Sequence, residues 1–134
     1  MRSVAVIGAG SWGTALAIHL ARVGHHVGLW ARDAALAADM AERRANAVYL
    51  PGVTFPESLA PTADLPRVLA TAQFVVVAVP SHGLRQVLRA GAPHVTPAAV
   101  VLSATKGIED GTLLRMSEVI GQEWPGVDEV AVLS

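Results

Sequence analysis

Three glycines near the start of the chain constrain its fold more than any other feature of the sequence. Gly8, Gly10 and Gly13 directly follow the apolar run 4–7, and the apolar, alanine-containing segment 14–22 comes after them. A strand that enters a glycine turn and a helix that leaves it form the unit that holds the pyrophosphate of a dinucleotide. The N-terminus of that helix offers free backbone N–H groups and the positive end of its dipole to the phosphates. The glycine loop therefore predicts a site for NAD, NADP or FAD.

Each glycine has its own expected role in such a loop. Gly8 allows the tight turn out of the strand, Gly10 lets the backbone approach the pyrophosphate, and Gly13 lets the helix pack closely on the strand. Trp12 is unusually bulky for this loop. It either forms a wall on the nicotinamide side of the pocket or packs against the following loop as part of a satellite core.

The composition restricts the class of protein. Of the 134 residues, 52% are apolar and 16% are charged, which suits one domain whose parallel strands are buried on both faces, or a surface covered by a further domain. The net charge of -1 gives no electrostatic case for nucleic acid or an anionic membrane as a partner. The chain has no cysteine, its histidines lack partners at ligand spacing, and we expect no metal site. It shows no transmembrane run or signal peptide, so we expect a cytoplasmic protein.

The hydrophobic pattern predicts strands that alternate with helices. We expect strands at 3–7, 26–30, 59–62, 74–79, 99–103 and 129–133, helices at 14–22, 34–44, 65–70, 84–90 and 112–122, and a loop at 46–56. This alternation is typical of an α/β fold, here a doubly wound, mostly parallel Rossmann-type sheet with helices on both faces. Residues 1–134 would form this one domain.

Ligands bind to such a sheet at the carboxyl ends of its strands, where Arg32 and Asp33 follow the second strand. Arg32 suits the 2′-phosphate of NADP or a stack on the adenine, although an ordinary surface arginine is the alternative. Asp33 either binds the ribose of NAD or caps the following helix, and capping is the favoured interpretation. NADP is therefore preferred, with NAD left open.

Two further residues lie at the same predicted edge of the sheet. Lys106 is the only lysine of the chain, and its position after a buried strand favours contact with a substrate phosphate or carbonyl over a solvated loop lysine. His82 follows another strand end. We interpret it as a residue that shapes the pocket and do not assign it a catalytic role.

Several segments together resemble one family. These are the glycine loop with its tryptophan, Trp30–Arg32, Asn46 with Tyr49–Gly52, Val79–His82, and the stretch Ser103–Glu109. They are similar to the N-terminus of bacterial-type NAD(P)-dependent glycerol-3-phosphate dehydrogenases. The resemblance spans essentially all 134 residues and rests most on Trp12 and on the sequence Thr-Lys-Gly-Ile-Glu at 105–109.

The resemblance implies hydride transfer between NAD(P)H and dihydroxyacetone phosphate, which gives sn-glycerol 3-phosphate for phospholipid synthesis. It implies cofactor contacts at Gly8, Ala9, Gly10, Ser11, Trp12, Gly13, Arg32 and Lys106, with Lys106 also contacting substrate. The proton donor of this family is a lysine of a helical C-terminal domain, and no residue here matches it. We therefore expect a truncated chain without a catalytic residue, whose partners are the substrate and its own C-terminal domain, with a homodimer left open.

Two other interpretations compete with this one. The chain could begin a related Rossmann dehydrogenase of the ketopantoate or 3-hydroxyacyl-CoA type, which shares the glycines but not Trp12 together with residues 105–109. It could also be a nucleotide-binding or redox-sensing module that carries out no chemistry.

Overall fold

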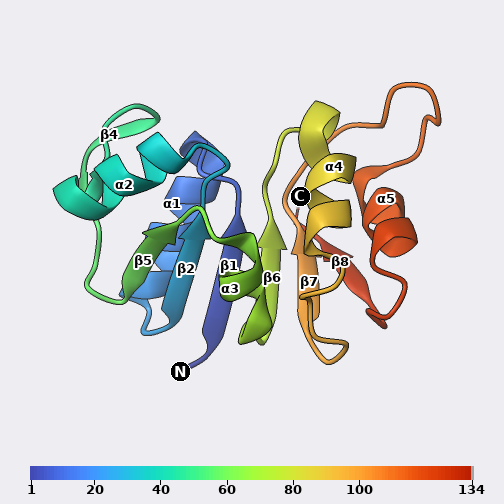
Figure 1. The fold of residues 1–134 in the computed structure, drawn as a ribbon, viewed down its shortest axis with the longest axis horizontal. Helices are drawn as coiled ribbons and strands as arrows, with labels where there is room; N and C mark the ends of the chain where they lie inside the picture. The colour runs from blue at the N-terminus through green and yellow to red at the C-terminus, as the bar shows by residue number, and fades with distance from the viewer. Residues whose placement is uncertain (134) are drawn as a thin grey trace.

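A six-stranded sheet, parallel throughout, forms the centre of the molecule, and the computed structural model describes residues 1–133 (Figure 1). Its strands are β1 (Ser3–Ile7), β2 (His26–Trp30), β5 (Leu59–Thr62), β6 (Phe74–Val77), β7 (Val100–Ser103) and β8 (Val130–Val132). The strand order is β5-β2-β1-β6-β7-β8. The predicted doubly wound, Rossmann-type α/β fold is confirmed.

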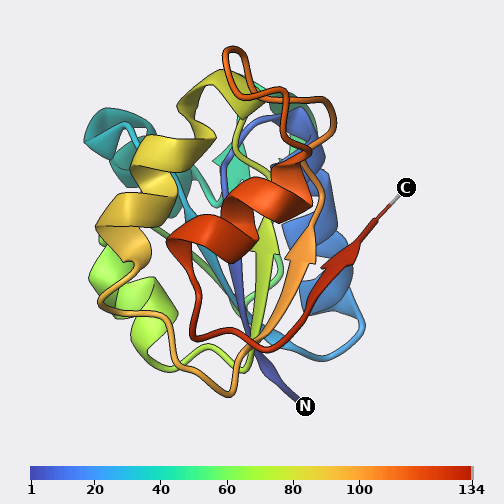
Figure 2. The ribbon, with the colours of Figure 1, turned by 90° about the vertical axis from the view of Figure 1, so that its right-hand side faces the viewer.

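Helices cover both faces of the sheet (Figure 2). They are α1 (Ser11–Arg22), α2 (Ala34–Arg43), α3 (Leu65–Ala70), α4 (Leu84–Gly91) and α5 (Met116–Glu123), with a 3₁₀ turn, η1, at Ser81–Gly83. Successive side chains of a strand point to opposite faces, so continuous apolar runs such as Val75–Val77 supply both cores. Helices α1 and α2 pack on one face, and α3, α4 and α5 pack on the other. No helix of residues 1–133 is long and apolar enough to cross a membrane.

The strand order reverses between β1 and β6, and the chain after both strands lies at this switch point. The first crossovers lead from β1 outward to β2 and β5, and the chain then returns to place β6 on the other side of β1. The backbone N–H of Ala78 donates to the Ile7 carbonyl at 2.8 Å, which keeps the two segments together beyond the last strand pair. A crevice at the carboxyl ends of the strands is the usual ligand position in such sheets.

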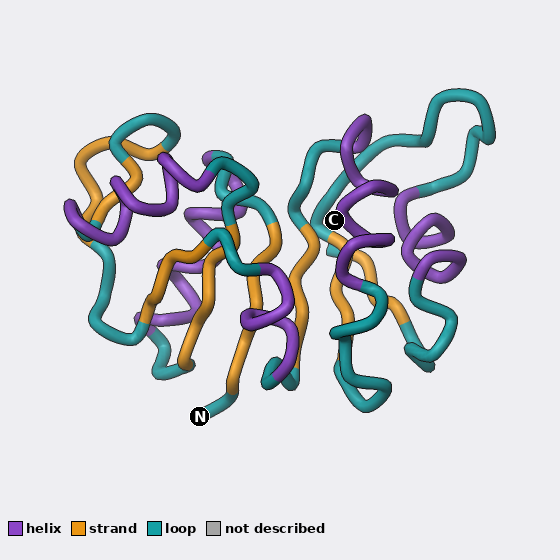
Figure 3. Tube along the Cα trace, in the orientation of Figure 1, coloured by secondary structure: helices purple, strands orange, loops and turns teal. Residues whose placement is uncertain are grey.

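The structure differs from the predicted elements in the segment 46–56. This segment is not a loop, because β3 (Ala45–Asn46) and β4 (Leu50–Thr54) form an antiparallel hairpin (Figure 3). Pro51 and Gly52 suggested a loop, but a proline is tolerated in a two-stranded ribbon, which has free edges.

Three element boundaries also differ by two residues or more, and others differ by one. Helix α1 begins at Ser11 rather than at residue 14, so the last part of the glycine motif is already helical. Strand β6 ends at Val77 rather than at residue 79. Helix α5 begins at Met116 rather than at residue 112, because Thr112 bonds to Glu109 and Leu113 adopts a left-handed conformation with φ of 59°.

Close packing at Gly13 yields a prediction about stability. A Cβ atom at Gly13 would overlap the Gly8 carbonyl oxygen and lie 3.3 Å from Ala78 Cβ, whereas one at Gly121, in α5, would meet nothing within 4 Å. We expect Gly13→Ala to lower the free energy of unfolding by about 1–3 kcal/mol through overpacking. Gly121→Ala should raise it by about 0.5–1 kcal/mol, because alanine is the better helix former. Urea unfolding of both variants measures the two signs, and equal effects would contradict the packing account.

Candidate functional site

The glycine loop lies at the switch point and is shaped by close backbone contacts. Gly8 has φ of +120°, and a Cβ atom there would lie 2.7 Å from the Ala78 carbonyl oxygen. The Gly8 N–H donates to the Trp30 carbonyl at 3.0 Å, which ties the turn to the end of β2. Gly10 differs, because a Cβ there would meet nothing within 4 Å. The turn at Gly8 and the close packing at Gly13 are thus as predicted. The open space over Gly10 lets a ligand approach the backbone there.

A cavity of about 310 Å³ opens above this loop. Most of its lining comes from the glycine loop, the end of β2 and the turn after β6, and α2, the hairpin and α4 each add one residue. The lining residues are Gly8, Ala9, Gly10, Trp30, Ala31, Arg32, Asp33, Leu36, Tyr49, Val79, Pro80, His82, Gly83 and Val87. The structure therefore brings Arg32, Asp33 and His82 together with the glycine loop, as their positions at strand ends predicted.

Asp33 caps α2, as the favoured interpretation predicted. One of its carboxylate oxygens, Oδ1, accepts from the N–H groups of Ala35 at 2.8 Å and Leu36 at 3.4 Å. Whereas Asp33 bonds to α2, Arg32 bonds to α4, where its Nη2 donates to Oε1 of Gln86 at 3.1 Å. The Arg32 guanidinium thus lies at the edge of the cavity beside Gly83.

Trp12 and Lys106 are both exposed at the carboxyl edge of the sheet. Trp12 lies in the first turn of α1 with 53% of its surface exposed, so its predicted alternative role in a satellite core is wrong. Neither residue lines the cavity above the glycine loop. Lys106 lies in the loop after β7, where Thr105 Oγ1 donates to the Val79 carbonyl at 2.6 Å and joins this loop to the turn after β6.

Asn46 supports the glycine loop through its side chain, a role that no local sequence pattern predicted. Its side chain is fully buried, and Nδ2 donates to the Ala9 carbonyl and to Thr14 Oγ1, both at 2.9 Å. Its Oδ1 accepts from the Tyr49 N–H at 3.1 Å. A buried amide with these three partners joins the hairpin to both ends of the loop. The only signal for it in the sequence was an asparagine within a segment predicted as a loop.

An ionic cluster lies beside the loop that carries Lys106. Arg85 in α4 makes a two-point contact with Glu109, with Nε–Oε2 and Nη2–Oε1 distances of 2.7 Å. Its Nη1 donates to Glu123 of α5, also at 2.7 Å. The bonds from Arg85 and Thr112 lower the pKa of Glu109 to about 2, and Arg85 also lowers the pKa of Glu123.

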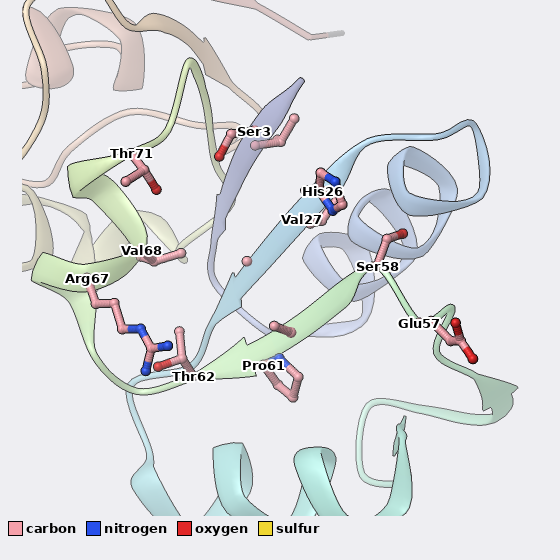
Figure 4. A pocket seen from close by; sticks show the side chains of 13 residues that line it. Ser3, His26, Val27, Glu57, Ser58, Pro61, Thr62, Arg67, Val68 and Thr71 are labelled. Carbon is pink, nitrogen blue, oxygen red and sulfur yellow. The ribbon is translucent and has the colours of Figure 1, made fainter. Parts of the chain in front are cut away.

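A second concavity, of about 470 Å³, is larger but lies elsewhere (Figure 4). It runs along β2 and β5 beside α3, from Ser3 and His26 at the amino ends of their strands to Arg67 and Thr71. Because ligands of doubly wound sheets bind at the carboxyl ends, this groove does not belong to the site at the glycine loop. Among residues 1–133, no three metal-ligating side chains gather at either place.

Comparison with known proteins identifies the family. Residues 3–134 match the family model described as the N-terminus of NAD-dependent glycerol-3-phosphate dehydrogenase. The chain belongs to this family. The predicted family and its NAD(P) cofactor class are thus confirmed.

Individual relatives agree with the family model. The chain is 48% identical over 132 residues to glycerol-3-phosphate dehydrogenase [NAD(P)+] of Moorella thermoacetica, and the match covers 98% of this chain and 39% of that protein. The crystal structure of glycerol-3-phosphate dehydrogenase from Coxiella burnetii superposes with a TM-score of 0.88 at 34% identity, over 98% of this chain and 39% of that one. The chain thus spans about two fifths of the length of these relatives.

A ketopantoate reductase, from one of the two competing dehydrogenase classes, shares the fold alone. A ketopantoate reductase from Ralstonia eutropha superposes over 96% of this chain and 39% of that one, with a TM-score of 0.67 at 22% identity. That likeness is weaker than the one to the Coxiella burnetii enzyme in both measures.

The buried Asn46 amide leads to a prediction about the loop. Asn46→Ala removes the two hydrogen bonds that the Asn46 amide donates to the glycine loop. We expect the substitution to lower the free energy of unfolding by about 1–3 kcal/mol and to weaken binding of NADPH. Ser58→Ala is the matched control, since it removes one hydrogen bond, from Oγ to the Ala21 carbonyl at 3.3 Å, away from the site. The control should leave NADPH affinity unchanged. Equal affinity losses in both variants, measured by calorimetric titration, would refute the supporting role of Asn46.

The ionic cluster leads to a prediction about pH. Glu109 titrates near its ordinary pKa of 4.5 when unfolded and at about 2 when folded, so the unfolded chain takes up the proton first as the pH falls. This contribution to stability is complete above pH 4.5 and should be lost as the pH falls toward 2. The difference in unfolding free energy between the wild type and Glu109→Gln should therefore shrink over this interval. A difference that stays constant from pH 6 to about 2 would contradict the folded-state ion pair.

Proposed function

We propose that residues 1–134 form the NAD(P)-binding domain of a cytoplasmic enzyme that interconverts dihydroxyacetone phosphate and sn-glycerol 3-phosphate for phospholipid synthesis. The observation that supports this most is the glycine loop at the switch point of a chain whose family is that of glycerol-3-phosphate dehydrogenases. In this proposal a helical substrate domain of the same protein covers the carboxyl edge of the sheet, and the complete enzyme can act as a homodimer.

The residues around the cavity fit a dinucleotide. Gly10 leaves open space over the loop, and α1 begins at Ser11, so the first N–H groups of a twelve-residue helix point toward that space. We assign the pyrophosphate to Gly8, Ala9, Gly10, Ser11, Trp12 and Gly13. Arg32 then contacts the 2′-phosphate of NADP or the adenine of either cofactor, since its guanidinium lies at the cavity edge. The bound nicotinamide supplies or accepts the hydride.

Lys106 is the residue of this chain that we assign to the substrate. Its ammonium group is exposed at the end of β7, and a point charge there suits a phosphate or a carbonyl oxygen that develops negative charge. We also assign it a contact with the cofactor. The proton donor belongs to the proposed C-terminal domain, so the 134-residue chain by itself should bind cofactor without turnover.

Cofactor binding tests the assignment of Arg32. The isolated chain should bind NADPH and NADH, and Arg32→Ala should raise the Kd for NADPH about tenfold more than the Kd for NADH, because a hydrogen bond to a charged group is lost. Arg67→Ala removes an exposed arginine of α3 at the other groove and should change neither value. If Arg32→Ala weakens both cofactors equally, the 2′-phosphate assignment is wrong.

Turnover tests the proposed function itself. The complete protein should oxidise NADPH or NADH when dihydroxyacetone phosphate is added, and the 134-residue chain should not. A complete protein that binds NADPH and leaves this substrate unchanged would overturn the proposed reaction. Turnover by the 134-residue chain would show that the proton donor lies within it.

A further inference from the structure

We propose that Arg85 is a positioning residue for Lys106, which it holds in place through Glu109. This inference rests on the proposed substrate role of Lys106. The hydrogen bonds of the Arg85 side chain go to Glu109, Gln122 and Glu123, and this proposal gives Arg85 no contact with the cofactor or the substrate. It acts on the loop that carries the lysine.

The loop after β7 has two anchors, one on each side of Lys106. Thr105 bonds to the Val79 carbonyl at 2.6 Å, next to the cavity above the glycine loop. Glu109 is held by two bonds from Arg85 at 2.7 Å and by one from Thr112 at 2.6 Å. Only Lys106, Gly107 and Ile108 lie between the anchors. Backbone bonds of Glu109 with Leu113 and Leu114, and the bridge between Ile108 and Arg115, close the turn at 108–115 on itself. The pair with Arg85 joins this turn to α4, and because a two-point arginine–carboxylate contact fixes direction as well as distance, it sets where the turn lies relative to α4.

The cluster is well placed for a positioning role because it is mostly shielded from water. The side chains of Arg85, Glu109 and Glu123 are 21%, 17% and 15% exposed. Partial burial keeps solvent and salt from weakening the contact as they weaken an ordinary surface pair. The cluster therefore joins α4, the Lys106 loop and the end of α5 at one guanidinium.

The packing of α4 on α5 does not require the contact to Glu109. Leu88 and Val87 of α4 share a buried core with Val119 and Ile120 of α5. Trp124 Nε1 also donates to the Leu88 carbonyl at 2.8 Å. Since these contacts already hold the two helices together, the bond from Arg85 to Glu109 serves the loop.

Arg89 offers a matched control on the same helix. It also contacts Glu123, with an Nε–Oε2 distance of 3.2 Å, but its side chain is 66% exposed and no bond joins it to Glu109. Removing Arg89 therefore weakens the α4–α5 contact and leaves the Lys106 loop in place. Arg85→Gln and Arg89→Gln change charge equally, so they separate loop positioning from electrostatic stabilisation.

Digestion measures the order of the loop directly. Lys106 is the only lysine, so endoproteinase Lys-C has one cleavage site in the 134-residue chain. We expect Arg85→Gln and Glu109→Gln to speed cleavage about tenfold or more, because local opening no longer breaks the ion pair. Arg89→Gln should stay close to the wild type. Equal cleavage rates for Arg85→Gln and Arg89→Gln would overturn the anchoring.

Kinetics of the complete enzyme test the consequence for substrate. Arg85→Gln should raise the KM for dihydroxyacetone phosphate by about tenfold to a hundredfold, since displaced binding groups cost this much. It should raise the Kd for NADPH much less, because the glycine loop and Arg32 are expected to hold the cofactor even when Lys106 is displaced. Arg85→Lys should restore only part of the loss, because a point charge cannot make the two-point contact. If the cluster merely stabilises the fold, Arg85→Gln and Arg89→Gln would change KM equally, and the proposal fails.

A double-mutant cycle completes the test. In a Lys106→Met background, Arg85→Gln should have no further effect on KM, because the residue it positions is gone. Additive effects of the two substitutions would overturn the proposal. Inactivity of the wild-type complete enzyme toward dihydroxyacetone phosphate would instead contradict the proposed function, and the Lys-C digestion would still show whether Arg85 anchors the loop.

Discussion

The close approach of three backbone segments at the switch point is the constraint on which the rest of the structure depends. Gly8, Gly13 and Ala78 come so near one another that no side chain fits between Gly8 and either neighbour. This contact lets α1 begin shortly after the end of β1, while β6 pairs with β1 on the edge away from β2. The topology therefore creates the site, because the backbone contacts that pack Gly8 against Gly13 and Ala78 leave open space over Gly10.

Side chains from distant parts of the chain then hold the loops at the carboxyl edge. Asn46 from the hairpin supports the glycine loop, Gln86 in α4 holds Arg32, and its neighbour Arg85 holds Glu109. Helix α4 thus contacts both the proposed cofactor side and the proposed substrate side through adjacent residues. Polar groups with fixed partners keep loops in one arrangement, and such order is what a site needs before its ligand arrives.

The sequence predicted the sheet and the first layer of the site because these follow from local patterns. Apolar runs such as 74–77 and the spacing of Gly8, Gly10 and Gly13 carry strand and turn information within a few residues. Asp33 was predicted as a helix cap for the same local reason, and the structure confirms it. The hairpin at 45–54 was missed because Pro51 suggested a loop, although a proline is also compatible with a two-stranded ribbon. The late start of α5 was missed because Thr112 bonds to Glu109 instead of extending the helix. The bond from Arg85 to Glu109 and the bonds from Asn46 to the glycine loop were missed because they join residues that lie 24 or more positions apart in the sequence.

Amide shifts in a titration of the ¹⁵N-labelled chain with NADPH test most directly whether a dinucleotide binds at the glycine loop. The largest shifts should fall on the amides of Gly8, Gly10 and Arg32, which line the cavity above the loop, and on Ser11, the first residue of α1. Shifts that cluster instead at Ser58, Arg67 and Thr71, in the groove beside α3, would contradict binding at the glycine loop.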